Sequence, residues 1–181
     1  EIYDYSVLEY SFAFWQWGTP VSTIPANNAS DDEIYKHFMA ISEPSYFAKG
    51  GGNESFFVQA ARELGYYGYD IRPFKKYLSI TSSKGYLKKL MLPDDAKDIK
   101  FDKTLSKKIT KFLKKNDPKM IFVYGEIDPW SAAATTWLNT DKKENVHIFV
   151  EPRGSHLARI NTLPKEMKQK AISILQKWLE E

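Results

Sequence analysis

Apolar residues recur every three or four positions in several stretches of the chain, and this spacing predicts amphipathic helices. The clearest stretch follows Ser30, which forms a capping-box pattern with Glu33 ahead of apolar residues that share one helix face. We therefore expect a helix over about residues 31–42, ended by Pro44.

Other segments carry the same helical spacing. We expect a second helix from Asn53, a candidate cap, to Gly65, another helix over about 103–115, and a last helix opened by Pro164. The glycine run at 50–52 lacks the Gly-Lys-Ser/Thr ending of a phosphate loop, so we interpret it as a flexible connection.

Two short runs of β-forming residues break the helical pattern. Residues 119–124 and 146–150 are apolar, which predicts two buried strands, with a turn at Gly125 and a helix through about residue 139 between them. The order strand, helix, strand, helix is typical of a parallel sheet covered by helices, so the predicted fold class is α/β. Two strands alone do not make a stable parallel sheet. We expect partner strands from elsewhere in the chain, from a second copy or from a preceding segment, and self-association where they are missing.

The first part of the chain is rich in aromatic residues. Residues 1–77 hold 18 of the 27 aromatic side chains, and the run from Tyr10 to Trp17 is apolar on nearly every face before it stops at Gly18. We expect this run to be buried, as a helix or as a strand. Because tryptophan and tyrosine also line peptide-binding clefts, a role in binding peptide is the alternative.

Composition excludes several classes of protein. The 181 residues are 43% apolar and 15% aromatic, which is enough for one compact domain or two small subdomains and too apolar for a disordered chain. No apolar run approaches the roughly 18 residues that span a bilayer. The chain has no cysteine, so disulfides and cysteine-ligated metal sites are excluded. The first residue is Glu1 and no signal-peptide pattern follows it, so we expect that the native start is missing.

Charge is distributed unevenly, although the net charge is only +3. Residues 75–119 contain fourteen lysines, five acidic residues and no arginine. A nucleic-acid site would combine arginine and aromatic side chains with the lysines, whereas these lysines are spaced as one face of a helix. We therefore expect a solvated surface and no nucleic-acid partner.

Two residues with catalytic chemistry follow the two predicted strands. Asp128 follows the first strand, and His156 follows the second, just before the last helix. Loops at the carboxyl ends of parallel strands open onto the active-site crevice, and aspartate followed by histidine is the chain order of the last two triad members in α/β-hydrolases. A histidine takes the proton of a serine and returns it to the leaving amine, while a carboxylate holds the ring in the required tautomer. We predict that Asp128 and His156 are catalytic.

The motifs around these residues resemble a known group of enzymes. Gly-Glu-Ile-Asp-Pro-Trp-Ser at 125–131 and Gly-Ser-His at 154–156 are similar to the aspartate and histidine motifs of the prolyl aminopeptidase and carboxypeptidase branch of the α/β-hydrolase serine peptidases, related to Pro-X carboxypeptidase and dipeptidyl peptidase II. The continuation Leu-Ala-Arg-Ile at 157–160 and the upstream Phe-Trp-Gln-Trp-Gly at 14–18 resemble the secreted bacterial prolyl tripeptidyl aminopeptidases.

The resemblance implies a partial α/β-hydrolase fold, in which a mostly helical cap over about residues 1–115 precedes the C-terminal part of the hydrolase domain over 116–181. It implies a secreted or periplasmic serine exopeptidase that releases tripeptides, with a preference for proline, from the N-termini of peptide substrates. In such an enzyme Asp128 orients His156, and His156 acts as the general base and then as the general acid, without a metal or an organic cofactor.

One element of the family pattern is missing from this sequence. The nucleophilic serine should lie in a Gly-x-Ser-x-Gly turn, but none of the fourteen serines has glycine at both positions. Ser83 is the nearest approximation, and we interpret Ser131 and Ser155 as turn residues. We expect the nucleophile and most of the oxyanion hole to lie on an N-terminal segment of the same enzyme, and the chain alone to be inactive.

Further candidates and alternatives stay open at this point. Glu9 and Glu126 are candidates for the carboxylate that pairs with the ammonium group of the substrate, because an ammonium in a half-buried cleft needs a partner. His37 is interpreted as a surface or packing residue. The alternatives to a peptidase are a non-catalytic interaction domain derived from an α/β-hydrolase and an esterase of the same fold.

Overall fold

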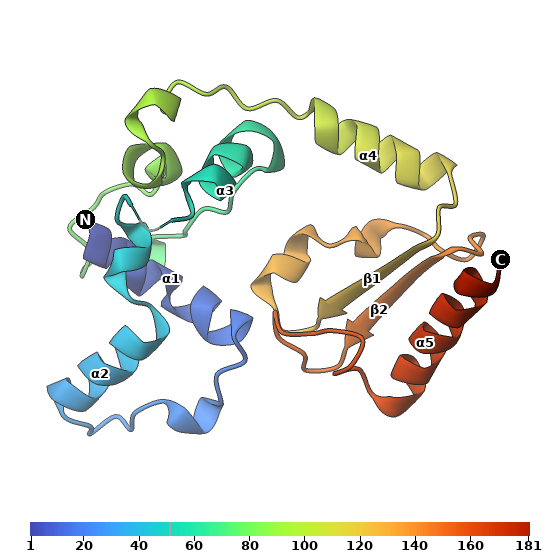
Figure 1. Cartoon of the computed structure of the whole chain (residues 1–181). Helices are drawn as coiled ribbons and strands as arrows, with labels where there is room; N and C mark the ends of the chain where they lie inside the picture. The colour runs from blue at the N-terminus through green and yellow to red at the C-terminus, as the bar shows by residue number, and fades with distance from the viewer. Residues whose placement is uncertain (51) are drawn as a thin grey trace. The chain divides into compact units, whose positions relative to one another are not determined.

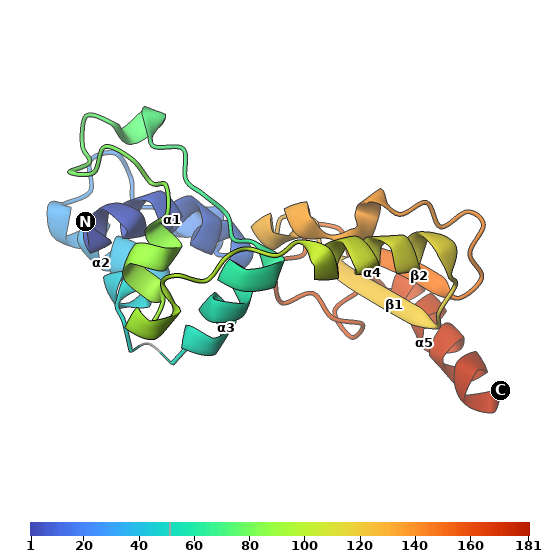
Figure 2. The ribbon, with the colours of Figure 1, turned by 90° about the horizontal axis from the view of Figure 1, so that it is seen from above.

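The computed structural model describes residues 1–50 and 52–181, so the connection predicted at 50–52 lies partly outside the described residues, at residue 51. The chain divides into two compact units. The first comprises residues 1–13 and 22–109, and the second comprises residues 14–21 and 110–181. Figures 1 and 2 show the course of the chain and its regular elements. In chain order these are α1 (Ile2–Gln16), α2 (Asp31–Ile41), α3 (Glu54–Gln59), α4 (Thr104–Lys115), β1 (Met120–Gly125), β2 (Val146–Glu151) and α5 (Lys165–Glu180).

The helices expected over 31–42, 103–115 and after Pro164 are confirmed as α2, α4 and α5. The capping box of α2 is complete: the Glu33 N–H donates to Ser30 Oγ at 3.3 Å, and the Ser30 N–H donates to Glu33 Oε2 at 2.9 Å. Both bonds satisfy backbone donors that the first helical turn leaves free, which explains why the helix starts there.

The helix expected from Asn53 to Gly65 forms, but the predicted cap is wrong. The backbone of Asn53, at φ −106° and ψ 13°, is outside the extended region that capping residues adopt, and its side chain makes no capping hydrogen bond. Helix α3 continues as a π-helical turn over Ala60–Leu64, where the Gly65 N–H donates to the Ala60 carbonyl at 2.9 Å. Gly65 ends the helix with φ +82°.

Aromatic side chains make up much of the core of the first unit. Tyr5 and Phe47 are each 1% exposed, and the rings of Tyr5 and Tyr86 stack with centroids 5.0 Å apart. The aromatic run ends helix α1, but its expected burial is only partly correct. Ala13 and Phe14 are buried, whereas the side chains of the two tryptophans are 42% and 52% exposed (Trp15 and Trp17).

The two strands form a parallel sheet in which Met120 pairs with Val146 and Gly125 with Glu151. One face packs against α5, and Figure 1 shows this helix beside the strands. The other face, with Phe122 and Ile148, packs against Leu113 and Leu138. The strands are less buried than predicted, because each has one neighbouring strand in the part of the chain that the structure describes, and the other edge stays open. A parallel sheet with helices against both faces is compatible with the predicted α/β class.

The helix predicted between the strands, through residue 139, is wrong. Two 3₁₀ turns replace it, at Pro129–Ala133 and Thr135–Trp137, separated by Ala134 in an extended conformation. The Thr135 N–H donates to the hydroxyl of Tyr124 at 3.1 Å, so it is not available for the backbone bond that would continue a helix. This bond ties the connection back to β1.

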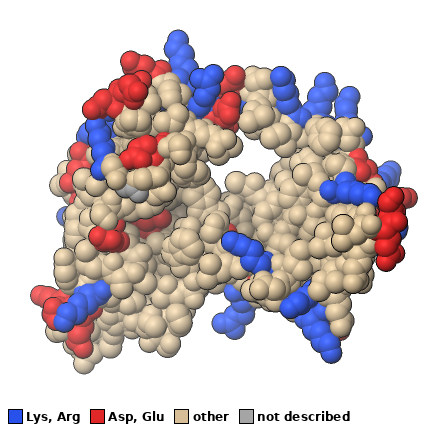
Figure 3. All heavy atoms as spheres, in the orientation of Figure 1, with Lys and Arg blue, Asp and Glu red and all other residues tan. Residues whose placement is uncertain are grey.

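The lysine-rich segment is largely exposed to solvent. Lysines gather over α4 in Figure 3, and five of them are exposed: Lys107, Lys108, Lys111, Lys114 and Lys115. Within residues 1–50 and 52–181, no helix has the combination of length and apolar character that crossing a membrane needs.

Candidate active site

Asp128 lies in the turn that follows β1. Its Oδ1 accepts a hydrogen bond from the Trp130 N–H at 3.0 Å, so the carboxylate caps the first 3₁₀ turn. The side chain is 9% exposed. This cap fixes the carboxylate and leaves Oδ2 for a second partner.

His156 lies in the loop that follows β2, and its Nδ1 is 2.7 Å from Oδ2 of Asp128. A carboxylate only accepts hydrogen bonds, so Nδ1 is the donor and Nε2 of the neutral ring carries the lone pair. Nε2 has no hydrogen-bond partner among the described residues, and the side chain is 43% exposed. The pair can therefore accept a proton at Nε2 and stabilise the resulting cation at Nδ1.

The two loops are joined directly by their backbones. The Glu126 N–H donates to the Glu151 carbonyl at 3.1 Å, and the Ile127 N–H donates to the Gly154 carbonyl at 3.0 Å. A Cβ atom at Gly125 would lie 2.2 Å from the Ser155 carbonyl oxygen, so only glycine permits this approach. The close approach places Asp128 within reach of the histidine.

A third segment, the turn at the end of α1, also contacts the loop between β2 and α5 that carries His156, here called the histidine loop (residues 152–164). The His156 N–H donates to the Gln16 carbonyl at 2.8 Å, and the ring of Trp17 is perpendicular to the imidazole, at 84°, with centroids 5.7 Å apart. At Gly18, with φ +68°, a Cβ would lie 3.0 Å from the Cβ of Ser155. Sequence analysis missed this contact, although a glycine directly after an aromatic run is a signal of close approach.

A cavity of about 450 Å³ lies between this turn and the histidine loop. Its walls include Trp15, Trp17, Pro20, Val21, Arg153 and Leu157.

Comparison with models of known protein families gives a match over nearly the whole chain. A family model described as PS-10 peptidase S37 matches residues 1–180. The chain belongs to the peptidase S37 family. The resemblance to prolyl tripeptidyl aminopeptidase-like peptidases, predicted from the motifs at 125–131 and 154–156, is thereby confirmed.

One curated relative of this peptidase S37 chain is the prolyl tri/tetrapeptidyl aminopeptidase of Streptomyces mobaraensis, which is 25% identical over 183 residues. The alignment covers 97% of this chain and 37% of the relative, so the chain spans little more than a third of the relative's length. No solved structure matches the chain.

The serines of the S37 chain that sequence analysis considered all make local hydrogen bonds. Ser83 Oγ donates to the Tyr69 carbonyl at 2.7 Å, and Ser131 Oγ donates to the Gly125 carbonyl at 2.7 Å. Ser155 Oγ accepts from the Leu157 N–H at 3.3 Å. The structure thus brings Asp128 and His156 together, while none of these hydroxyls bonds to Nε2.

The two candidate carboxylates for the substrate ammonium differ in environment. Glu9 is 6% exposed, and its Oε2 accepts hydrogen bonds from the hydroxyls of Tyr67 at 2.8 Å and Tyr69 at 2.6 Å. Burial raises the pKa of Glu9, although both hydroxyls oppose the rise by stabilising the carboxylate. Glu126 is exposed, and its Oε2 accepts from the Arg153 N–H at 2.7 Å. Sequence and structure leave both as candidates.

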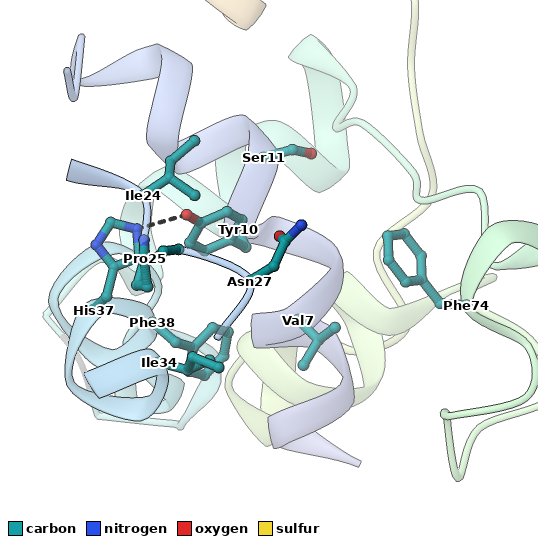
Figure 4. Close-up of a pocket in the computed structure, with 11 residues that line it drawn as sticks. Val7, Tyr10, Ser11, Ile24, Pro25, Asn27, Ile34, His37, Phe38 and Phe74 are labelled. Atoms are coloured by element: carbon teal, nitrogen blue, oxygen red, sulfur yellow. Dashed lines mark hydrogen bonds between the residues drawn. The ribbon is translucent and has the colours of Figure 1, made fainter. Parts of the chain in front are cut away.

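His37 lies on α2, where its Nε2 is 2.7 Å from the hydroxyl of Tyr10. Figure 4 shows this bond at the wall of a largely apolar cavity of about 490 Å³ in the first unit, lined also by Ile24, Ile34 and Phe38. Across residues 1–50 and 52–181, no three histidine or acidic side chains gather in an arrangement that could hold a metal ion.

Proposed function

We propose that this chain is the C-terminal portion of a serine exopeptidase of the α/β-hydrolase type, in which Asp128 and His156 are the acid and the base of the catalytic triad. The enzyme would release tripeptides, with a preference for proline, from the N-termini of peptides. The observation that carries the proposal is the 2.7 Å contact between Nδ1 of His156 and Oδ2 of Asp128, combined with an Nε2 atom that has no partner in the described residues.

The proposed chemistry follows from this geometry. Nε2 of His156 takes the proton of a serine hydroxyl as the oxygen attacks the peptide carbonyl, and Asp128 stabilises the imidazolium that forms. His156 then gives the proton to the leaving amine, and a water molecule releases the peptide from the serine by the same route. The serine belongs to an N-terminal segment, for which the greater length of the Streptomyces relative is the support.

The proposed domain organisation divides the chain at about residue 115, with a helical cap before it and the end of the hydrolase sheet after it. The parallel pairing of β1 with β2, and a catalytic candidate after each strand, support a hydrolase sheet. Secretion is proposed from the motif resemblance alone.

The decisive experiment is the Asp128→Asn variant of the full-length enzyme, assayed on a chromogenic proline-containing tripeptide. The amide oxygen can still accept from the Trp130 N–H, so the turn is kept, but the amide nitrogen donates to Nδ1 and forces the proton of His156 onto Nε2. A ring in this tautomer cannot accept the serine proton, and we expect kcat to fall by about 10³–10⁴-fold.

Asp141→Asn is the matched control, because Asp141 is an exposed carboxylate in the connection between the same two strands. It should keep the activity of the unmodified enzyme. A loss below tenfold in Asp128→Asn would refute the triad. If the full-length enzyme cleaves acyl esters but no peptides, the result favours the alternative function, an esterase of the same fold.

A further inference from the structure

The turn at the end of α1 also contacts His156, although it lies more than 100 residues before Asp128 in the sequence. Residues 14–21 and residues 110–181 belong to the same compact unit, so the turn and the histidine loop form part of one packed structure. Two contacts join them directly: the His156 N–H donates to the Gln16 carbonyl at 2.8 Å, and the ring of Trp17 packs against the imidazole at 5.7 Å.

The imidazole needs such support because its other attachment is slight. One hydrogen bond, from Nδ1 to Asp128, holds a side chain that is 43% exposed. A single hydrogen bond restrains the position of Nδ1 but leaves the ring plane free to tilt about it. A displacement of about 1 Å at a reacting atom can cost about 10²-fold in rate.

Trp17 supplies the restraint that the hydrogen bond lacks. The two ring planes meet at 84° with centroids 5.7 Å apart, an arrangement in which the positive edge of one aromatic ring meets the negative face of the other. The backbone next to the indole is held close to the histidine loop, because Gly18 lets the chain pass close to Ser155. The contact therefore resists tilting of the imidazole away from Asp128.

We propose that Trp17 is a positioning residue for His156, which holds the imidazole so that Nδ1 meets Asp128 and Nε2 faces the substrate. The proposal rests on the catalytic role proposed for His156. It assigns Trp17 no contact with substrate, so its removal should affect the chemical step and leave substrate binding nearly unchanged.

The first test is a proton NMR spectrum of full-length enzyme labelled with ¹⁵N-histidine. The proton that Nδ1 donates to a carboxylate gives a low-field signal only while the ring stays in place. We expect this signal in the unmodified enzyme and in Trp17→Phe, which keeps an aromatic ring, and we expect its loss in Trp17→Leu. Persistence of the signal in Trp17→Leu would overturn the proposal.

The matched control is Trp137→Leu. Trp137 is a similarly exposed tryptophan of the same unit, at 47% against 52% for Trp17, and its ring packs under the Lys114 ammonium group. This variant should keep the low-field signal. Circular dichroism spectra of all variants must match that of the unmodified enzyme. If Trp17→Leu misfolds, Trp17→Ala replaces it in the comparison with Trp17→Phe, with the same expected loss of the low-field signal.

The second test separates kcat from KM on the tripeptide substrate. We expect Trp17→Leu to lower kcat by about 10–100-fold with KM changed less than threefold, and Trp17→Phe to restore most of the rate. A raised KM with unchanged kcat would overturn the proposal, because it would make Trp17 a substrate contact. If Asp128→Asn is inactive and Trp17→Leu is fully active, only the positioning role fails. If Asp128→Asn is fully active, the proposed function fails, and the NMR result still decides whether Trp17 holds the ring.

Discussion

The two oxygens of the Asp128 carboxylate have different partners. Oδ1 accepts from the Trp130 N–H and so holds the turn, and Oδ2 contacts His156, so one side chain combines a structural role with a proposed catalytic role. An alanine at this position would remove both interactions, and a loss of activity would then have two explanations. Asparagine keeps the first interaction and reverses the polarity of the second, which is why it is the more informative substitution.

Glu9 should make stability depend on pH. Burial raises its pKa in the folded state, so the folded protein binds this proton more tightly than the unfolded chain does. The resulting stabilisation is complete at a pH below the unfolded pKa and is lost as the pH rises through the folded pKa. In Glu9→Gln the side chain is neutral throughout and still accepts from Tyr67 and Tyr69. We therefore expect the unfolding free energy of the unmodified protein, relative to Glu9→Gln, to fall as the pH rises above about 4.3.

Denaturant titrations at a series of pH values measure this difference. Glu144→Gln is the control, because it makes the same substitution at an exposed side chain. A constant difference between the unmodified protein and Glu9→Gln across the series would contradict the expected role of burial at Glu9.

At the scale of elements, the end of β1 is the point where the site is assembled. Gly125→Ala would place a methyl group 2.2 Å from the Ser155 carbonyl oxygen and 2.4 Å from that of Gly154, and both are backbone atoms that cannot turn aside. The histidine loop would have to move, so we expect the free energy of unfolding to fall by about 1–3 kcal/mol. In the full-length enzyme the same variant should lose activity on the tripeptide substrate.

Thermal unfolding and the peptidase assay check this prediction, with Gly68→Ala as the control. Gly68 has no atom within 4 Å of an added Cβ and no positive φ, so its replacement should be tolerated. Equal stability of the two variants would show that the histidine loop can move without a loss of stability, which would contradict this prediction.

Local sequence patterns predicted most elements, because their signals are local. The capping box at Ser30 and the apolar periodicity predicted α2, α4 and α5, and the β-forming runs predicted both strands. The connection after β1 was mispredicted because its conformation depends on a bond from Thr135 to the hydroxyl of Tyr124, which periodicity does not reveal.

The candidate site also has a part that could be predicted from the sequence and a part that could not. Asp128 and His156 could be predicted because each follows a strand, and strand ends in a parallel sheet meet at one edge. The contact between Trp17 and His156 could not be predicted, since it joins segments that are far apart in the sequence. Their contact depends on how the aromatic turn packs within the second unit.

At the scale of the whole molecule, the chain contains the two residues proposed as the acid and the base but no Gly-x-Ser-x-Gly motif. We expect the purified chain alone to show no turnover of proline-containing tripeptide substrates, and a protein that also includes the proposed N-terminal segment to be active. Chromogenic assays of both proteins measure the difference. Turnover by the chain alone that disappears in Ser83→Ala would identify a nucleophile within this sequence and contradict the proposed division of the triad.

The backbone bonds from Glu126 to Glu151 and from Ile127 to Gly154 also matter for protein engineering. Because they join backbone atoms, these bonds do not depend on which side chains the two loops carry. A library could therefore vary the exposed side chains of both loops. Gly125 is the position to hold constant, because an added Cβ would lie 2.2 Å from the Ser155 carbonyl oxygen.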